Sequence, residues 1–266
     1  MKLNTSWFFF SRQLDQGKTT IIVDYACRSV RSVILDESSI SPSPLMNVLD
    51  LFFPKFCLGC GKWGSYVCTS CFCKIRPLPY LKCPICGRAS IDGCTHPRCK
   101  KRFGLDRLIS FFPYTGIIQK AIKTIKYRYA YKVTDDVLRN VSFVDLPTQS
   151  MFATIPLHPS RRRLRGFNQA EIIAKVLLKR FDISVRTDIL KRVRKTIPQV
   201  DMKNREDRLL NMKGVFVVNK ENIPAILQNT IILVDDVYTT GATMQSACEV
   251  LKRAGIKTVW GLTIAQ

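Results

Sequence analysis

Short apolar runs alternate with amphipathic segments from residue 105 onward, and this pattern predicts strands alternating with helices. The strands are expected at residues 108–112, 153–157, 231–234 and 258–264. The helices are expected at residues 116–131, 168–180 and 241–254, where apolar residues recur at helical spacing. Such alternation predicts an α/β fold with a mainly parallel sheet flanked by helices.

The strand at 231–234 runs directly into Asp235 and Asp236, and a Thr-Thr-Gly-Ala-Thr loop then opens a helix. Ligands bind at the carboxyl ends of strands in open α/β sheets, and a helix N-terminus attracts anions. The two carboxylates are therefore candidate catalytic residues that accept hydrogen bonds from ribose hydroxyls, and one of them is expected to contact magnesium. The candidate 5-phosphate ligands are Thr239, Thr240, Gly241, Ala242 and Thr243. A metal strand of a nucleotide hydrolase or a receiver domain would also end in acids, but neither explains this loop.

Cysteines are paired in two similar blocks between residues 57 and 99, as in an internal repeat. Four thiolates at Cys-x2-Cys spacing form a closed, structural tetrahedral zinc site. The expected ligands of the first site are Cys57, Cys60, Cys68 and Cys71. Those of the second are Cys83, Cys86, His96 and Cys99, with Cys94 as the alternative to His96.

The same thiols favour a cytoplasmic protein, where paired cysteines bind metal rather than form disulfides. The sequence contains neither a secretory signal nor an apolar stretch long enough for a membrane span. We expect a double zinc-ribbon at 46–104 and an α/β domain at 105–266. Residues 1–45 are interpreted as an upstream extension, with Met46 as the working start.

The chain is strongly basic: 42 Lys+Arg against 20 Asp+Glu give a net charge of +22. Most of the excess lies in residues 98–132 and 158–213, where the sequence gives net charges of +9 and +10. Such a field attracts nucleic acid or phosphorylated ligands, although a solvated charge run is the simpler alternative. Four arginines within residues 161–165 follow the expected strand at 153–157 and suit phosphate oxygens.

Several ordered motifs together resemble the ComF family over roughly residues 46–266. They are the Cys-x2-Cys pairs, Lys126-Tyr127, Pro156-Leu157-His158-Pro159, Arg165-Gly166-Phe167-Asn168-Gln169, Thr196-x2-Gln199, Arg208-x2-Asn211 and Val234–Thr243. The last segment resembles the phosphoribosyl-pyrophosphate motif of type I phosphoribosyltransferases. The resemblance implies a double zinc-ribbon on a phosphoribosyltransferase-like domain, with two structural zinc ions.

The resemblance also implies roles for individual residues. Asp235 and Asp236 would bind the ribose of phosphoribosyl pyrophosphate with magnesium, and the Thr-Thr-Gly-Ala-Thr loop would bind its 5-phosphate. Arg162 and Arg165 would contact pyrophosphate or nucleic acid, and residues 196–208 would form a mobile segment over the site. The implied partners are single-stranded DNA during competence and DNA uptake, and a protein of the competence machinery.

Two functional classes remain open at this point. The first is a DNA-handling protein that binds a phosphoribosyl ligand, which the excess positive charge favours. The second is an active phosphoribosyltransferase of nucleotide metabolism, whose acceptor the sequence does not identify. A regulator that senses phosphoribosyl pyrophosphate is a third and weaker possibility.

Overall fold

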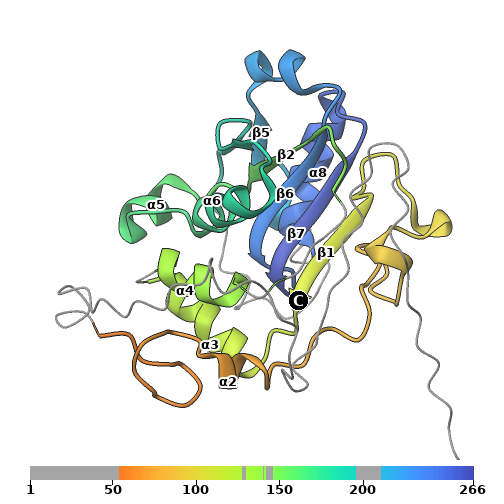
Figure 1. Ribbon diagram of the computed structural model, residues 1–266. Helices are drawn as coiled ribbons and strands as arrows, with labels where there is room; N and C mark the ends of the chain where they lie inside the picture. Colours follow the sequence, from red (N-terminus) through yellow and green to blue (C-terminus); the bar gives the residue numbers. More distant parts are fainter. Residues whose placement is uncertain (1–53, 128–129, 140, 142–145, 196–210) are drawn as a thin grey trace, which may run out of the picture.

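A five-stranded parallel sheet lies at the centre of the computed structural model (Figure 1). The structure describes residues 54–127, 130–139, 141, 146–195 and 211–266. The strand order is β1-β7-β6-β2-β3. These strands are β1 (Arg107–Phe112), β2 (Ser150–Thr154), β3 (Val185–Arg186), β6 (Thr230–Val237) and β7 (Val259–Ala265). The α/β class with a mainly parallel, helix-flanked sheet is thus confirmed.

The central strand β6 is apolar on both faces, because the sheet is covered on both sides. Ile232 and Val234 belong to one hydrophobic cluster, while Ile231 and Leu233 belong to the other. All four are fully buried. Since successive side chains of a strand point to opposite faces, these two clusters are the two faces of the sheet.

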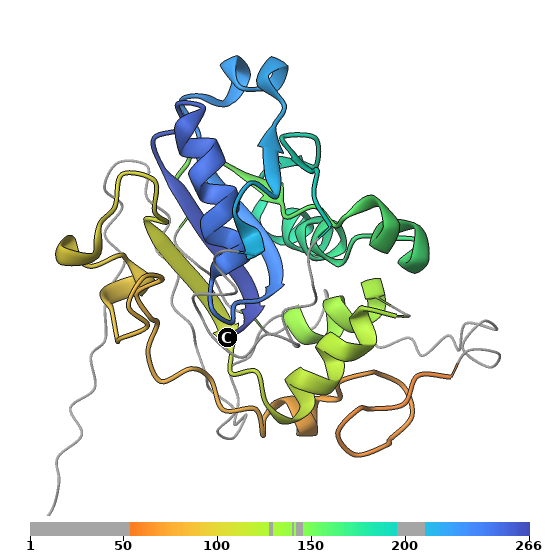
Figure 2. The same ribbon diagram turned by 180° about the vertical axis from the view of Figure 1, so that it is seen from behind.

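Helices cover both faces, and Figures 1 and 2 show them from opposite sides. The first face carries α3 (Gly116–Ile125), α4 (Ala130–Leu138) and α6 (Gln169–Phe181). The second face carries α8 (Ala242–Arg253) and an antiparallel hairpin of β4 (Leu190–Arg192) and β5 (Phe216–Val218). The remaining short elements are α2 (Thr69–Phe72), α5 (Pro159–Arg165) and the 3-10 turns η1 (Ile91–Gly93), η2 (Pro97–Cys99), η4 (Lys220–Asn222) and η5 (Pro224–Ile226).

Three expected elements differ from the structure. The helix expected over 116–131 is two helices, since α3 ends at Ile125 and α4 begins at Ala130. The strand expected at 153–157 is β2, which ends earlier at Thr154; Pro156 lacks the N–H that a continuing ladder would need. The arginine-rich loop after it contains α5, which begins with a proline, a residue suited to the first turn of a helix.

The two cysteine-rich blocks lie apart from each other on the sheet domain. In Figure 1 the first block runs below α3, whereas the second lies beside β1. Residues 1–45 and Met46 lie outside the described residues, so the extension and the start site remain predictions, as does the boundary after residue 104. Across the described chain, every helix is too short or too polar to span a bilayer.

Candidate functional site

The connections of the sheet reverse direction between β2 and β6. From β2 the chain passes through α6 to the outer strand β3, whereas from β6 it passes through α8 to β7 on the other side. The two helices cover opposite faces of the sheet. A crevice for ligands forms outside the carboxyl ends of strands at such a reversal. The segments after Thr154 and Val237 therefore flank the candidate site.

Asp235 and Asp236 lie near the end of β6 and point to opposite faces, as neighbours on a strand do. The backbone N–H of Asp236 donates to Asp235 Oδ1 at 2.8 Å, and that of Val237 donates to Asp236 Oδ1 at 2.8 Å. Burial raises the pKa of Asp235 well above its ordinary value, and the adjacent Asp236 carboxylate raises it further. Such a pair gains stability from a cation or from hydroxyl donors placed beside it.

Lys126 supplies one cation at this site. It caps the carboxyl end of α3, and its Nζ lies 2.9 Å from Asp236 Oδ2. Burial lowers the pKa of Lys126, but the attraction of Asp236 and then Asp235 outweighs it, and the net pKa is raised. The sequence contained Lys126 only as part of a family motif, and nothing in the local pattern predicted its pairing with Asp236.

The Thr-Thr-Gly-Ala-Thr segment forms the turn into α8, with Gly241 as the N-cap residue in the left-handed region (φ 78°). A small recess of about 20 Å³ lies among Asp235, Gly241 and Thr243. Thr240 Oγ1 is buried and has no hydrogen-bond partner among the described residues. An unpaired hydroxyl at a helix N-terminus fits an oxygen of a bound phosphate.

Gly241 admits no side chain, because a Cβ there would lie 2.0 Å from Tyr238 Oη. We expect Gly241→Ala to displace the Tyr238 ring and distort the turn, costing about 2–4 kcal/mol of unfolding free energy. Gly214→Ala is the matched control, since Gly214 also has positive φ (67°) but open space around it. Urea unfolding of both variants separates the cost of alanine at positive φ from the cost of the clash with Tyr238. Equal losses of unfolding free energy in the two variants would contradict the prediction.

The two arginines expected at pyrophosphate are held by α6. Arg162 makes a two-pronged ion pair with Glu171 at 2.9 and 3.2 Å, and Arg165 donates to Gln169 Oε1 at 3.1 Å. Arg162 is nevertheless 57% exposed along its side chain. Their role toward pyrophosphate or nucleic acid therefore remains a prediction. To bind either ligand, the two arginines would have to release Glu171 and Gln169.

Two other arginines lie near the loop after β2, and one of them, Arg192, also lies near Asp235. Burial lowers the pKa of Arg192 to about 10; repulsion by Arg161 adds to this, and attraction by Asp235 opposes it. Burial also lowers the pKa of His158, followed by the positive charges of Arg192 and Lys195. Arg161 on α5 and Arg192 on β4 thus converge from separate stretches of sequence. Only the fold brings them together, and the sequence analysis did not single them out.

The first cysteine block brings together the four expected ligands. The Sγ atoms of Cys57, Cys60, Cys68 and Cys71 all lie within 4.8 Å of one another, and Cys60 and Cys68 are 3.7 Å apart. Zn–S bonds of about 2.3 Å in a tetrahedron give S···S separations of roughly 3.8 Å. A Cβ at Gly59 would lie 2.7 Å from Cys71 Sγ, so this turn needs glycine. The group fits zinc.

The second block gathers Cys83, Cys86, His96 and Cys99, with ligand atoms again within 4.8 Å of one another. His96 Nδ1 faces Cys86 Sγ at 3.3 Å, and His96 Nε2 lies 2.9 Å from the Ala89 carbonyl oxygen. If Nε2–H donates to that carbonyl, Nδ1 keeps the lone pair that a metal ligand requires. The alternative ligand Cys94 is exposed and outside the group. This block also fits zinc.

The two blocks have the same turn, which supports the internal repeat. Cys57 N donates to Lys62 O at 2.8 Å, and Cys83 N donates to Arg88 O at 2.9 Å. They dock differently, however. The buried carboxylate of Asp136 on α4 accepts from Tyr66 N at 2.6 Å in the first block, whereas Tyr238 Oη donates to Pro84 O at 2.7 Å in the second.

Known proteins resemble this chain in sequence over about three quarters of its length. Residues 165–264 match the family described as phosphoribosyl transferase domain. Competence protein F of Haemophilus influenzae is 27% identical over 213 residues, 75% of this chain and 90% of that protein. Competence protein ComFC of Streptococcus pneumoniae is 29% identical over 73% of this chain and 85% of its own. DNA utilization protein YhgH of Salmonella typhi is 27% identical over 76% of this chain and 90% of that protein.

The resemblance to the ComF family is thus confirmed: the chain is similar over about three quarters of its length to relatives named as competence proteins, and it has a phosphoribosyl transferase domain. The structure gives physical reasons for residues of the motifs that resemble this family. Asn168 caps α6, since its Oδ1 accepts from Ala170 N at 3.2 Å, and its Nδ2 donates to Ile155 O at 3.0 Å. One buried side chain thereby fixes α6 against the segment after β2. The motif segment at 196–210, including the expected mobile region, lies outside the described residues.

Proposed function

We propose that this protein binds phosphoribosyl pyrophosphate, or a related phosphoribosyl ligand, at the carboxyl ends of β2 and β6. The observation that carries the proposal is the placement of Asp235 and Asp236 directly before the turn that caps α8. Carboxylates suit ribose hydroxyls, and the helix N-terminus with the unpaired Thr240 hydroxyl suits the 5-phosphate. Arg161 and Arg192 are further candidates for the pyrophosphate.

Magnesium would accompany such a ligand, since two adjacent carboxylates provide the oxygen donors that this ion prefers. It would neutralise pyrophosphate charge while Asp235 and Asp236 orient the ribose. The two zinc ions would be structural, because four protein ligands leave no open coordination position. We place the protein in the cytoplasm, where such thiolates stay reduced.

We further propose that the protein handles single-stranded DNA during competence and DNA uptake, with a competence-machinery protein as a possible partner. The relatives named as competence proteins support this, as does the net charge of +22. Three exposed cations lie on or just after β4, namely Lys191, Arg194 and Lys195. The positive charge of Lys195 acts on His158 together with the charges of α5 arginines. Tyr127, 74% exposed, is available to stack on a base.

The DNA proposal predicts a steep dependence of affinity on salt. Each phosphate contact on a single strand contributes about 0.7 to the slope of log K against log salt, because counterions are released. We expect Lys191→Ala/Arg194→Ala/Lys195→Ala to lower this slope by about 2, as measured by fluorescence anisotropy with a labelled oligonucleotide. The control is Lys257→Ala, which removes an exposed lysine before β7. A flat salt response of the parent would refute DNA binding.

An active phosphoribosyltransferase of nucleotide metabolism is the second candidate. The same site would hold phosphoribosyl pyrophosphate while a nucleophile displaces pyrophosphate at the anomeric carbon. Arg161 and Arg192 would stabilise the charge on the departing pyrophosphate. This alternative requires a pocket for an acceptor beside the ribose. Release of pyrophosphate dependent on an added acceptor would favour it over the binding protein.

A further inference from the structure

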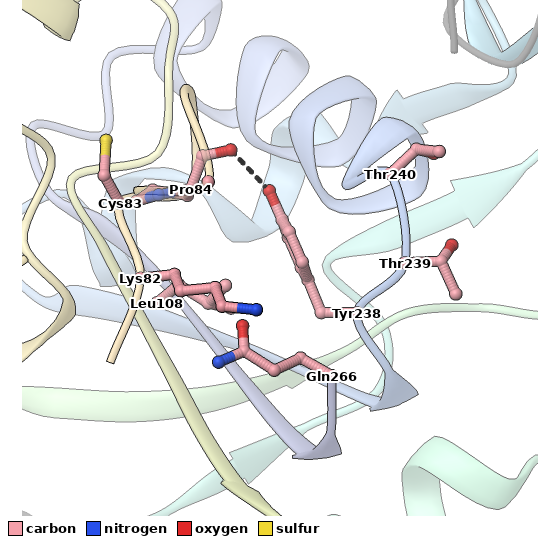
Figure 3. A pocket seen from close by; sticks show the side chains of 9 residues that line it. Lys82, Cys83, Pro84, Leu108, Tyr238, Thr239, Thr240 and Gln266 are labelled. Carbon is pink, nitrogen blue, oxygen red and sulfur yellow. Dashed lines mark hydrogen bonds between the residues drawn. The ribbon is translucent and has the colours of Figure 1, made fainter. Parts of the chain in front are cut away.

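A cavity of about 270 Å³ lies between the second metal-binding turn and the loop that caps α8. Figure 3 shows Pro84 facing Tyr238, with Lys82 and Gln266 below them, and Leu108 also lines the cavity. Its walls come from the cysteine-rich block, from β1, from the phosphate loop and from the residue directly after β7. The cavity therefore exists only when the second block is docked on the sheet domain.

The cavity contains a hydrogen-bond donor that lacks an acceptor among the described residues. Gln266 Nε2 is buried and has no partner in the part of the chain that the structure describes. The backbone of Gln266 is fixed, because its N–H donates to Phe112 O at 3.0 Å and its carbonyl accepts from Tyr114 N at 2.9 Å. In Figure 3 the Lys82 ammonium lies on the side of the Gln266 side-chain oxygen. A ligand oxygen placed here would satisfy a donor that is costly to leave unpaired.

Tyr238 and Leu108 give the cavity an apolar surface. The Tyr238 ring is held at both ends, since its Oη donates to Pro84 O at 2.7 Å and its backbone N–H donates to Ala265 O at 2.8 Å. Leu108 adds an aliphatic surface from β1. A fixed aromatic face together with an unpaired amide donor and a nearby ammonium suits a planar ring that carries carbonyl oxygens.

The size and position of the cavity narrow the choice of ring. Its volume lies just below the roughly 300–1,000 Å³ of pockets for drug-sized ligands, so it accommodates about one ring system. Thr239 and Thr240 of the phosphate loop line the same cavity. A ring bound there would therefore be a neighbour of the sugar whose 5-phosphate occupies that loop.

We propose that this cavity binds the oxo-bearing base of a nucleotide whose ribose 5-phosphate occupies the phosphoribosyl site. Gln266 and Lys82 donate hydrogen bonds to the base carbonyl, and Tyr238 forms the apolar wall. The inference rests on the proposed function, because the base is positioned by its sugar phosphate. It adds what the phosphoribosyl site alone does not provide, namely a place for the base of a transferase product or of a terminal nucleotide of DNA.

Isothermal titration calorimetry of the full chain loaded with zinc tests the proposal, using ribose 5-phosphate and uridine 5′-monophosphate in parallel. We expect the parent to bind the nucleotide at least tenfold more tightly than the sugar phosphate. Gln266→Ala and Lys82→Ala should each remove most of that preference. Lys257→Ala, an exposed lysine at the amino end of β7, should retain it. Zinc content and melting temperature confirm that each variant is folded.

The outcomes separate this inference from the function beneath it. If ribose 5-phosphate binds but uridine 5′-monophosphate binds no more tightly, the base pocket is refuted while the phosphoribosyl site stands. If neither ligand binds, the proposed function itself fails. A preference that survives both Gln266→Ala and Lys82→Ala would place the base elsewhere and would also overturn the assignment.

Discussion

Asp235→Asn/Asp236→Asn is expected to bind phosphoribosyl pyrophosphate with magnesium at least 100-fold more weakly than the parent chain. Each carboxylate provides charged hydrogen bonds worth about 1.5–3 kcal/mol, and about 1.4 kcal/mol corresponds to a factor of ten in affinity. Asparagine keeps the volume of the side chain but supplies neither the charge nor a second acceptor oxygen. Calorimetry with the magnesium complex measures the loss directly.

The control for this variant removes the same two charges elsewhere. Asp182→Asn/Glu221→Gln neutralises exposed acids that precede β3 and β6 rather than follow the strands. It should bind the ligand like the parent. Because Asp236 pairs with Lys126 at 2.9 Å, unfolding free energies of all three proteins are compared as well. Equal ligand affinity in the parent and the Asp235/Asp236 variant would show that neither carboxylate contributes to ligand binding.

Removal of a metal ligand is expected to have the largest effect on stability. The parent should contain two zinc ions per chain by elemental analysis, whereas Cys71→Ser and Cys99→Ser should each contain one. Zinc contributes about 10–16 kcal/mol to the folding of isolated zinc-finger peptides, which exceeds what so small a block gains from its apolar contacts. We therefore expect either block to unfold locally without its metal, with a lower melting temperature.

Cys94→Ser tests the choice of ligands in the second block. Cys94 is exposed and lies outside the cluster that contains His96, so this variant should retain both zinc ions. Loss of one zinc from Cys94→Ser, with retention of both in His96→Gln, would reverse the assignment.

Unfolding of the first block would also affect the sheet domain, because it deprives the buried Asp136 carboxylate of the Tyr66 N–H.

Features encoded by neighbouring residues could be predicted from the sequence. The run at 231–234 predicted β6 because a strand buried on both faces needs consecutive apolar residues. The Cys-x2-Cys pairs predicted both metal groups for a similar reason, since each pair closes one tight turn. His96 was preferred to Cys94 from spacing alone, and the cluster in the structure contains His96.

Features that depend on distant contacts could not be predicted in this way. Lys126 and Asp236 form their ion pair across the first face of the sheet, and Tyr238 reaches Pro84 across 154 positions of sequence. Arg192 faces Asp235 only because the β4–β5 hairpin folds over the second face. Apolar periodicity carries no information about such pairs. The short strands β3, β4 and β5 escaped detection because two or three residues display no periodicity.

The order of the strands has a consequence for synthesis on the ribosome. Of the described strands β1 is made first, yet its neighbour in the sheet is β7, which is made after all the others, with Ser110 opposite Thr263. A nascent chain that ends before residue 259 therefore exposes the apolar edge of β1 with no strand to pair with. The two metal-binding turns close within short stretches and can fold as soon as they emerge. During translation the two metal-binding turns therefore fold first, while β1 stays unpaired until β7 has been made. In that interval β1 is the segment that a chaperone would protect.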